Sequence, residues 1–378
     1  MEKIFETIIV GAGPAGLTVG RYLEDALILE KEKEIGRPVQ CAEGLTKRAL
    51  ERQEIESDPS WVSAVLDSSQ VILPNGKIVT LSIGKAGFVL DRINFEKFLA
   101  QKCKAKIRLQ QRVKEIEREN GSWRVKTERG DILKSKYLIG ADGPTSIVRR
   151  KVFKEKVKIL PLIQYLVKLQ KDIDTTKIKM YFDKERFCNG YAWIFPKSKN
   201  TANIGLGTTA HLQESFEDFM ENTVKKELGP YELLENRSGA MSWGGAKIKL
   251  FKDNAFLVGD AGGLVDPIFG GGINNAMISG KIAAESILSA KPHLYESKIK
   301  SISFFSKDLL TVQKIVYSFD NRVLNEIGDI LEKKGGDILY LKTFPAFFDL
   351  LSKPNLRKNI LKFLKVIFIY HKHAGSWL

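Results

Sequence analysis

The chain has 378 residues, which is more than one hydrophobic core usually serves, so we expect two domains and an extension. Its apolar fraction of 43% and charged fraction of 28% are typical of a folded soluble protein. Its three cysteines predict no disulfide framework, which fits a reducing, cytoplasmic setting, and its four scattered histidines predict no metal site. The net charge of +15 favours anionic partners, but no nucleic-acid module is recognisable, so we expect an anionic lipid surface and not nucleic acid.

A glycine-rich motif, GAGPAG at residues 11–16, directly follows the apolar run Thr7–Val10. Gly11 permits a tight turn out of a strand, Gly13 lets the backbone approach a pyrophosphate, and Gly16 lets the next helix pack close to the sheet. The N-terminus of that helix also presents N–H groups and a positive dipole end to phosphate. The motif therefore predicts a dinucleotide site, with a purely structural glycine turn as the alternative.

The next apolar run, Ala26–Leu29, predicts a second strand that is followed by Glu30. A carboxylate at this place suits the hydroxyl groups of a ribose. Leu17–Asp25 leaves room for a helix of only about two and a half turns. This part of the dinucleotide-binding unit is therefore shorter than usual.

The middle of the chain contains several strand-like runs. Trp123–Thr127 and Ile132–Leu133 flank a turn with Gly130 and predict a hairpin. Residues 177–182 and 202–206 alternate between apolar and polar side chains, which suits an antiparallel sheet. We expect that sheet to form the wall of a substrate cavity.

Two aspartates follow apolar runs, Asp142 after Tyr137–Ile139 and Asp260 after Ala255–Val258. Each carboxylate should lie at the carboxyl end of a strand, where ligands bind in open α/β sheets. The alternative is that each aspartate caps a helix. That alternative is weaker for Asp260, because the glycines at 270–272 open a helix with bare N–H groups that suit flavin and phosphate atoms.

The last part of the chain, from residue 297, has a helical pattern. Near its end, apolar residues recur at helical spacing opposite a basic stripe: Ile360, Leu361, Leu364, Ile367 and Phe368 against Lys358, Lys362 and Lys365. Such a helix either packs on the protein's own core or lies in a membrane interface. No run reaches the roughly 18 apolar residues needed to span a bilayer, so membrane contact should be peripheral.

The three motifs, in this order, resemble the para-hydroxybenzoate hydroxylase type of flavoprotein. Two further segments narrow the resemblance: RPVQCAEG at residues 37–44 is similar to a PxxCxEG segment, and GYAWIFP at residues 190–196 matches a YxWxFP signature. Both are features of the geranylgeranyl reductase family, and the chain is identified as a member of it, similar to the archaeal digeranylgeranylglycerophospholipid reductases. The likeness extends from residue 1 to about residue 290.

The resemblance implies an α/β fold. It comprises a Rossmann-type FAD-binding domain, an antiparallel-sheet substrate domain and a helical C-terminal extension. The expected division is discontinuous, with residues 1–70, 88–150 and 250–295 in the FAD-binding domain, 71–87 and 151–249 in the substrate domain, and 296–378 in the extension.

The family resemblance also implies an activity, the FAD-dependent reduction of isolated C=C bonds in geranylgeranyl chains of lipid precursors, with hydride from N5 of the reduced flavin. The electron donor stays open between NAD(P)H and a ferredoxin-like protein. By resemblance, FAD contacts Ala15, Glu30, Cys41, Ala42, Gly44, Arg92, Val113, Asp260, Gly272 and Ile273. To these the motifs themselves add Gly11, Gly13, Gly16, Asp142 and Gly271. The guanidinium of Arg92 suits a pyrophosphate, and the alternative is an ordinary surface helix start at Asp91–Arg92.

Four residues are candidates for substrate binding and catalysis. Tyr191, Trp193 and Phe195 alternate onto one face of a strand, where their rings could line the lipid cavity and stabilise positive charge, or could simply form a sheet core. Cys41 is the catalytic candidate, as a proton source or a positioning group, and its alternative is a small buried apolar contact.

Two other functions are compatible with the flavin motifs. A flavin-dependent monooxygenase of a hydrophobic substrate shares the glycine and aspartate motifs, although the CAEG and YAWIFP segments argue against it. A non-catalytic flavoprotein that binds lipid is the second, suggested by the short helix after the glycine motif. Hydroxylated product would favour the first, and absence of FAD from the purified protein would favour the second.

Overall fold

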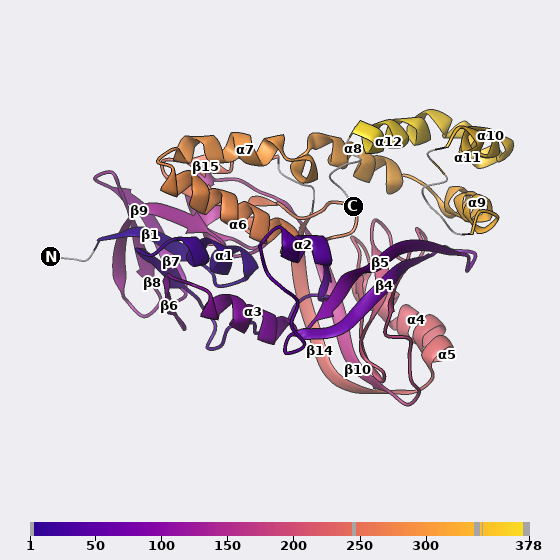
Figure 1. The fold of residues 1–378 in the computed structure, drawn as a ribbon, viewed down its shortest axis with the longest axis horizontal. Helices are drawn as coiled ribbons and strands as arrows, with labels where there is room; N and C mark the ends of the chain where they lie inside the picture. Colours follow the sequence, from indigo (N-terminus) through magenta and orange to yellow (C-terminus); the bar gives the residue numbers. More distant parts are fainter. Residues whose placement is uncertain (1–3, 244–246, 336–340, 342, 373–378) are drawn as a thin grey trace.

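The computed structural model describes residues 4–243, 247–335, 341 and 343–372. Two eight-stranded sheets lie side by side, and a layer of helices runs across both (Figure 1). The glycine motif directly follows β1 of sheet A, and sheet B contains the middle of the chain. This arrangement agrees with the expected α/β fold.

Sheet A has the strand order β15-β16-β9-β1-β2-β6, with β8 pairing with β9 and β7 with β8. The pairs along β16, β9, β1, β2 and β6 are parallel, and apolar runs such as Ile8–Val10 are buried on both faces, as parallel sheets require. The hairpin predicted around Gly130 is confirmed by the antiparallel pairing of β8 with β9. The strands are β1 (Ile4–Val10), β2 (Ala26–Leu29), β6 (Lys106–Arg108), β7 (Val113–Glu119), β8 (Ser122–Thr127), β9 (Ile132–Gly140), β15 (Phe251–Lys252) and β16 (Ala255–Leu257).

Three helices flank sheet A: α1 (Pro14–Tyr22), α3 (Arg92–Gln101) and α6 (Ile273–Leu288). The short helix expected before the second strand is confirmed, since α1 has nine residues and β2 begins at Ala26. α1 packs closely on α6, because a Cβ placed on Gly280 would lie 2.6 Å from the carbonyl oxygen of Ala15. The bare backbone of Gly280 therefore sets how near the two helices come.

Sheet B has the order β14-β10-β13-β12-β11-β4-β5-β3. The antiparallel pattern predicted for residues 177–182 and 202–206 is confirmed, with one exception: β11 pairs in parallel with β4. The helices α4 (Leu212–Phe219) and α5 (Lys225–Leu228) cover part of the sheet, with Phe216 and Phe219 fully buried. The strands are β3 (Gly44–Thr46), β4 (Val62–Ile72), β5 (Ile78–Leu90), β10 (Lys158–Leu169), β11 (Lys177–Tyr181), β12 (Tyr191–Ser198), β13 (Thr201–Gly207) and β14 (Tyr231–Trp243).

The chain passes from sheet A to sheet B after β2 and returns to sheet A with β6. β3 begins at Gly44, β4 begins at Val62 and β5 ends at Leu90, so sheet B takes more of this region than residues 71–87. α2 (Lys47–Glu51) lies between β3 and β4. The division into domains stays a prediction, whereas the strand pairing shows which residues belong to each sheet.

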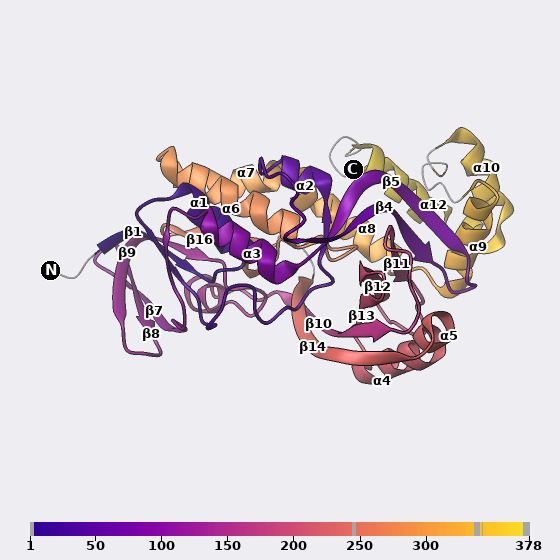
Figure 2. The same ribbon diagram turned by 60° about the horizontal axis from the view of Figure 1, so that its bottom comes forward.

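The C-terminal helices form the layer above both sheets (Figures 1 and 2). α9 packs on the β4–β5 hairpin, where a Cβ on Gly328 would lie 2.6 Å from Cδ1 of Leu73, and α12 packs on α8. Ser306 caps α8 and Asp320 caps α9 through their side chains. The helices are α7 (Tyr295–Ser301), α8 (Lys307–Val316), α9 (Asn321–Glu332), α10 (Phe344–Ser352), α11 (Pro354–Lys358) and α12 (Ile360–Lys372).

Candidate functional site

The turn between β1 and α1 is built by three glycines with different surroundings. Gly11 has a φ of +101°, and a Cβ there would lie 2.5 Å from the carbonyl oxygen of Ala141. A Cβ on Gly16 would lie 2.0 Å from the carbonyl oxygen of Gly11. Gly13, by contrast, precedes α1 with no protein atom within 4 Å of such a Cβ. Two glycines are therefore required by the protein itself, and Gly13 faces open space into which a phosphate group would fit.

Glu30 lies at the end of β2, beside this turn. Its carboxylate accepts hydrogen bonds from the backbone N–H groups of Ala12, at 2.6 Å, and Glu32, at 2.9 Å. These two donors fix the carboxylate against the glycine turn. Its contact with a ribose stays a prediction.

Asp142 lies after β9 and has its own partners. Ser146 Oγ donates to one carboxylate oxygen at 2.5 Å, and the backbone N–H of Ile147 donates to the other at 2.6 Å. Burial raises the pKa of Asp142, while these donors act in the opposite direction. This is the geometry of the capping alternative, and a role of Asp142 at the cofactor stays a prediction.

Asp260, after β16, is placed differently. Oδ2 accepts the backbone N–H of Ser242 at 3.1 Å, while Oδ1 lies 3.5 Å from where a Cβ on Gly272 would be. Gly272 precedes α6, and no side chain caps that helix. Burial raises the pKa of Asp260, and the Ser242 N–H and the positive charges of Arg92 and Arg149 oppose that rise. A carboxylate oxygen and a bare helix N-terminus thus face each other, which suits a polar, anionic cofactor.

Arg149 is a buried residue of this region that the sequence reading missed. Its guanidinium donates to the carbonyl oxygens of Pro144 and Ala261, the latter at 2.9 Å. It therefore joins the loop after β9 to the loop after β16. The sequence feature that could have pointed to Arg149 is its position seven residues after Asp142.

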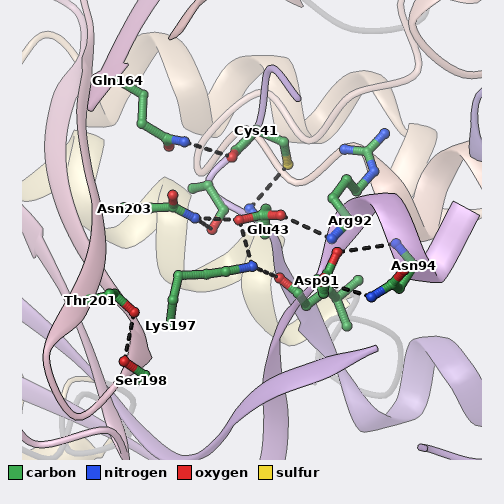
Figure 3. A network of polar contacts seen from close by, with 12 residues as sticks. Cys41, Glu43, Asp91, Arg92, Asn94, Gln164, Lys197, Ser198, Thr201 and Asn203 are labelled. Atoms are coloured by element: carbon green, nitrogen blue, oxygen red, sulfur yellow. Dashed lines mark hydrogen bonds and ion pairs between the residues drawn. The ribbon is translucent and has the colours of Figure 1, made fainter. Parts of the chain in front are cut away.

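The loop Cys41–Gly44 leads into β3 of sheet B, and Glu43 lies at the centre of a network of polar contacts (Figure 3). Glu43 is only 2% exposed. One carboxylate oxygen accepts the backbone N–H of Arg92 at 2.9 Å, and the other is 2.9 Å from Nζ of Lys197 and accepts the amide of Asn203. Sequence reasoning placed Glu43 in a family motif but gave it no role. Its partners show that it ties α3 of one layer to β12 and β13 of sheet B.

Arg92 lies beside this loop with 18% of its side chain exposed, and Asp91–Arg92 does begin a helix, α3, as the alternative predicts. Its guanidinium pairs with Glu96 at 2.5 Å, while Asp91 caps α3 through the N–H of Asn94. Burial opposes the charge of the guanidinium, but the neighbouring Glu96, Cys41 and Glu43 outweigh that effect and raise the pKa of Arg92. A permanent positive charge therefore lies next to Cys41. Its contact with a pyrophosphate stays a prediction.

Tyr191, Trp193 and Phe195 of β12 share one face, as predicted. The Tyr191 hydroxyl donates to the carbonyl oxygen of Phe269 at 2.6 Å, and the Phe195 ring lies 2.9 Å from where a Cβ on Gly44 would be. The indole N–H of Trp193 donates to Gln164 Oε1 at 3.0 Å. The three aromatic side chains thus join the sheet to the Cys41–Gly44 loop and to the glycine loop before α6.

The other predicted cofactor residues lie on the same elements or near them. Ala15 is on α1, Ala42 packs in a cluster with Trp193 and Phe195, Gly271 accepts the N–H of Asp266 at 3.0 Å, and Ile273 begins α6. Val113 lies further along the chain, at the start of β7. Their contacts with FAD stay predictions.

The chain is similar to several known proteins. Residues 159–241 match the model of the geranylgeranyl reductase catalytic domain. A digeranylgeranylglycerophospholipid reductase of Methanosarcina acetivorans is 32% identical, over 97% of this chain and 97% of that protein. The crystal structure of a geranylgeranyl bacteriochlorophyll reductase-like protein from Thermoplasma acidophilum superposes with a TM-score of 0.81 at 25% identity, covering 96% of this chain and all of that one. A flavin-dependent brominase shares the fold, with a TM-score of 0.65 at 18% identity and 99% of each chain covered.

Proposed function

This chain belongs to the geranylgeranyl reductase family, and from that premise we propose that it reduces isolated C=C bonds in geranylgeranyl chains of archaeal-type ether lipid precursors, with FAD as its cofactor. The observation that best supports this activity is that three aromatic side chains contact two loops of the proposed cofactor site. Tyr191, Trp193 and Phe195 contact the Cys41–Gly44 loop and the loop before α6. An apolar, aromatic wall beside a dinucleotide cradle suits a hydrocarbon substrate.

The residues proposed to hold FAD belong to both halves of the site. Gly11, Gly13 and Gly16 shape the phosphate turn, and Gly272 and Asp260 face each other at α6. The full proposed set is Gly11, Gly13, Ala15, Gly16, Glu30, Cys41, Ala42, Gly44, Arg92, Val113, Asp142, Asp260, Gly271, Gly272 and Ile273. When bound and reduced, FAD supplies a hydride from N5 to one alkene carbon.

The chain's own groups have three tasks in this reaction. The rings of Tyr191, Trp193 and Phe195 orient the lipid chain and exclude water, and those of Trp193 and Phe195 are nearly closed to solvent. An isolated alkene has no carbonyl to polarise it, so the aromatic faces also stabilise the partial positive charge that develops on the more substituted carbon. Cys41 is the candidate for the group that holds the proton needed at the second carbon, with its Sγ accepting the N–H of Glu43 at 3.2 Å.

The experiment that tests the function uses dithionite-reduced, FAD-loaded enzyme and geranylgeranyl lipids. Mass spectrometry should detect successive gains of about two mass units per alkene, the hydride and proton of flavin chemistry. The oxidised enzyme is the control and should leave the lipid unchanged. A gain of about sixteen mass units, from one oxygen atom, would instead support a monooxygenase.

We further propose that the protein works at a membrane surface. Leu361 and Phe368 of α12 are 80% and 71% exposed, and Phe348 of α10 is also exposed. Lys362 and Lys365 are exposed on the same helix, and Lys358 precedes it. Exposed apolar side chains amid lysines suit an anionic lipid bilayer, into whose interface the rings would insert.

This membrane contact is proposed as peripheral. Within the described part of the chain, no helix combines the length and the apolar character that crossing a bilayer requires. A lipid substrate held in a bilayer would then enter the protein from that surface. The electron donor, whether NAD(P)H or a ferredoxin-like protein, stays open.

A further inference from the structure

The indole of Trp193 reaches across a neighbouring strand to a glutamine. Trp193 on β12 pairs with Gly205 on β13, and Gly205 pairs with Gln164 on β10. A Cβ placed on Gly205 would lie 2.3 Å from Cζ2 of Trp193. Any larger residue would occupy the space of the indole, so the bare backbone of Gly205 is what lets Trp193 extend to Gln164.

Gln164 is buried, with 4% of its surface exposed, and both ends of its amide are used. Oε1 accepts the indole N–H of Trp193 at 3.0 Å, and Nε2 donates to the carbonyl oxygen of Cys41 at 3.0 Å. One amide thus joins the aromatic wall to the backbone of the loop that presents the Cys41 thiol. Figure 3 shows the hydrogen bond from Gln164 to Cys41. Each hydrogen bond fixes the orientation in which the amide can make the other.

The loop is held at a second point close by. The amide of Asn203 donates to the Glu43 carboxylate, and the guanidinium of Arg237 donates to Oδ1 of Asn203 at 3.3 Å. Glu43 and its partners therefore anchor the loop, while Gln164 contacts the backbone of Cys41 itself. Loss of Gln164 would leave the loop attached but free to shift at Cys41.

We propose that Gln164 is a positioning residue that couples Trp193 to Cys41, so that the placement of the thiol depends on the position of the indole. The catalytic role of this coupling rests on the proposed function, because it requires a lipid chain that moves the Trp193 ring and thereby the Cys41 loop. The coupling itself is a property of the protein without substrate.

The test measures how fast iodoacetamide labels Cys41 in the full-length flavoprotein without lipid, by peptide mass spectrometry. The variants are Trp193→Phe, which keeps a ring but removes the indole N–H, Gln164→Met, which keeps length but removes the amide, and the double variant. Cys188 in each sample serves as the internal reference. Trp123→Phe is the matched control, because the Trp123 indole also donates one hydrogen bond, to the carbonyl oxygen of Asp253 between β15 and β16.

We expect each single variant to change the Cys41 labelling rate roughly threefold or more, and the double variant to change it no further than one single variant does, since residues that act through one link are not additive. Trp123→Phe should label at the parent rate. A parent-like Cys41 rate in either Trp193→Phe or Gln164→Met, or multiplied effects in the double variant, would overturn the coupling.

A fourth variant separates the two hydrogen bonds. Gln164→Glu can still accept the indole N–H but, as a carboxylate, cannot donate to Cys41. It should label like Gln164→Met, and parent-like labelling would contradict the proposal. Turnover with geranylgeranyl lipid is measured in parallel, where a lower kcat at unchanged KM is expected. Labelling as expected in a protein that reduces no lipid would contradict the proposed function alone.

Discussion

At the scale of single residues, the three glycines of the β1–α1 turn differ in what a side chain would meet. A side chain on Gly16 would collide with the Gly11 carbonyl, whereas one on Gly13 would enter open space. Gly13→Val should therefore fold but weaken FAD binding by at least about tenfold, equivalent to about 1.4 kcal/mol. Flavin absorbance and circular dichroism of the purified variant check this.

Gly16→Val is the contrasting variant, and it should lose both flavin and folded protein because its clash lies within the chain. Full flavin content in Gly13→Val would contradict the proposed phosphate turn.

Trp193 and Trp123 provide a second comparison. Both are buried and each donates one hydrogen bond, but only Trp193 lies beside the Cys41–Gly44 loop. Either change to alanine should lower the free energy of unfolding by roughly 3–5 kcal/mol. Only Trp193→Ala should also lose alkene reduction per bound flavin, measured below the melting temperature of each variant. Equal turnover in the two variants would leave Trp193 with a packing role alone.

Cys103 should be an unreactive thiol. Burial raises the pKa of Cys103 to about 12, so at pH 8 only roughly one molecule in ten thousand is thiolate. Iodoacetamide labelling of Cys103 should be far slower than that of a free cysteine peptide, and should rise about tenfold for each pH unit up to pH 10. Fast labelling at pH 8 would show that the thiol is open to solvent.

Some residue roles could be predicted from the sequence and others could not. Gly11, Gly13 and Gly16 could be assigned from spacing, because their conformational demands are local. Glu43 and Gln164 could not be given roles, because their partners are distant in sequence: 160 residues separate Glu43 from Asn203, and 123 separate Cys41 from Gln164. Asp142 satisfied the pattern of a strand-end carboxylate, yet the pattern does not say that residues 146–148 take up both oxygens.

At the scale of elements, α12 differs from the single apolar face that its spacing predicts. Phe363 and Ile369 are buried and Ile360 and Ile367 pack beside them, while Leu361 and Phe368 are exposed. Apolar residues thus occupy two sides of the helix, one against the protein and one toward solvent. Periodicity alone could not separate these sides, because the choice depends on where α8 and α9 lie.

The lysines of this region should govern binding to anionic liposomes. Changing Lys358, Lys362 and Lys365 to glutamine removes three surface charges, each contributing on the order of 1 kcal/mol at low salt. Co-sedimentation with anionic liposomes should fall, and activity on detergent-dispersed lipid should stay near that of the parent. If the triple variant sediments like the parent at both low and high salt, the lysines do not direct membrane contact.

The two sides of α12 can also be tested separately. Leu361→Ser and Phe368→Ser together should reduce liposome binding without lowering the melting temperature, since both side chains are exposed. Phe363→Ala should do the reverse, because its ring is buried against Phe319. A fall in melting temperature with the serine pair would assign those side chains to packing.

At the scale of the whole molecule, the proposed cofactor residues come from loops of both sheets, so FAD should stabilise the entire protein. At a free FAD concentration of 100 times Kd, the native state gains about 2.7 kcal/mol. Thermal unfolding followed by circular dichroism and by tryptophan fluorescence should shift upward together when FAD is added to the apoprotein. A shift in one signal only would mean that the sheets unfold independently.

The fold class could be predicted from the motifs, but the path between the sheets could not. The sequences of β4 and β5 are compatible with either sheet, because the pattern of a strand does not determine which strand it pairs with. The parallel pairing of β4 with β11 joins residues 68–72 to residues 177–181, and no local signal marks such a pairing. The antiparallel pair of β12 and β13 was easier to expect, since β12 ends at Ser198 and β13 begins at Thr201.

The order of strands in sheet A also has a consequence for how the protein is made. β1 is synthesised long before its neighbour β9, which ends at residue 140, and before β16, which pairs with β9 and ends at residue 257. The nascent N-terminal segment therefore exposes an unpaired apolar strand edge while most of the chain is still being translated. Such long-range pairing slows folding and invites aggregation, so synthesis of this protein should depend on chaperones that shield β1 until β9 arrives.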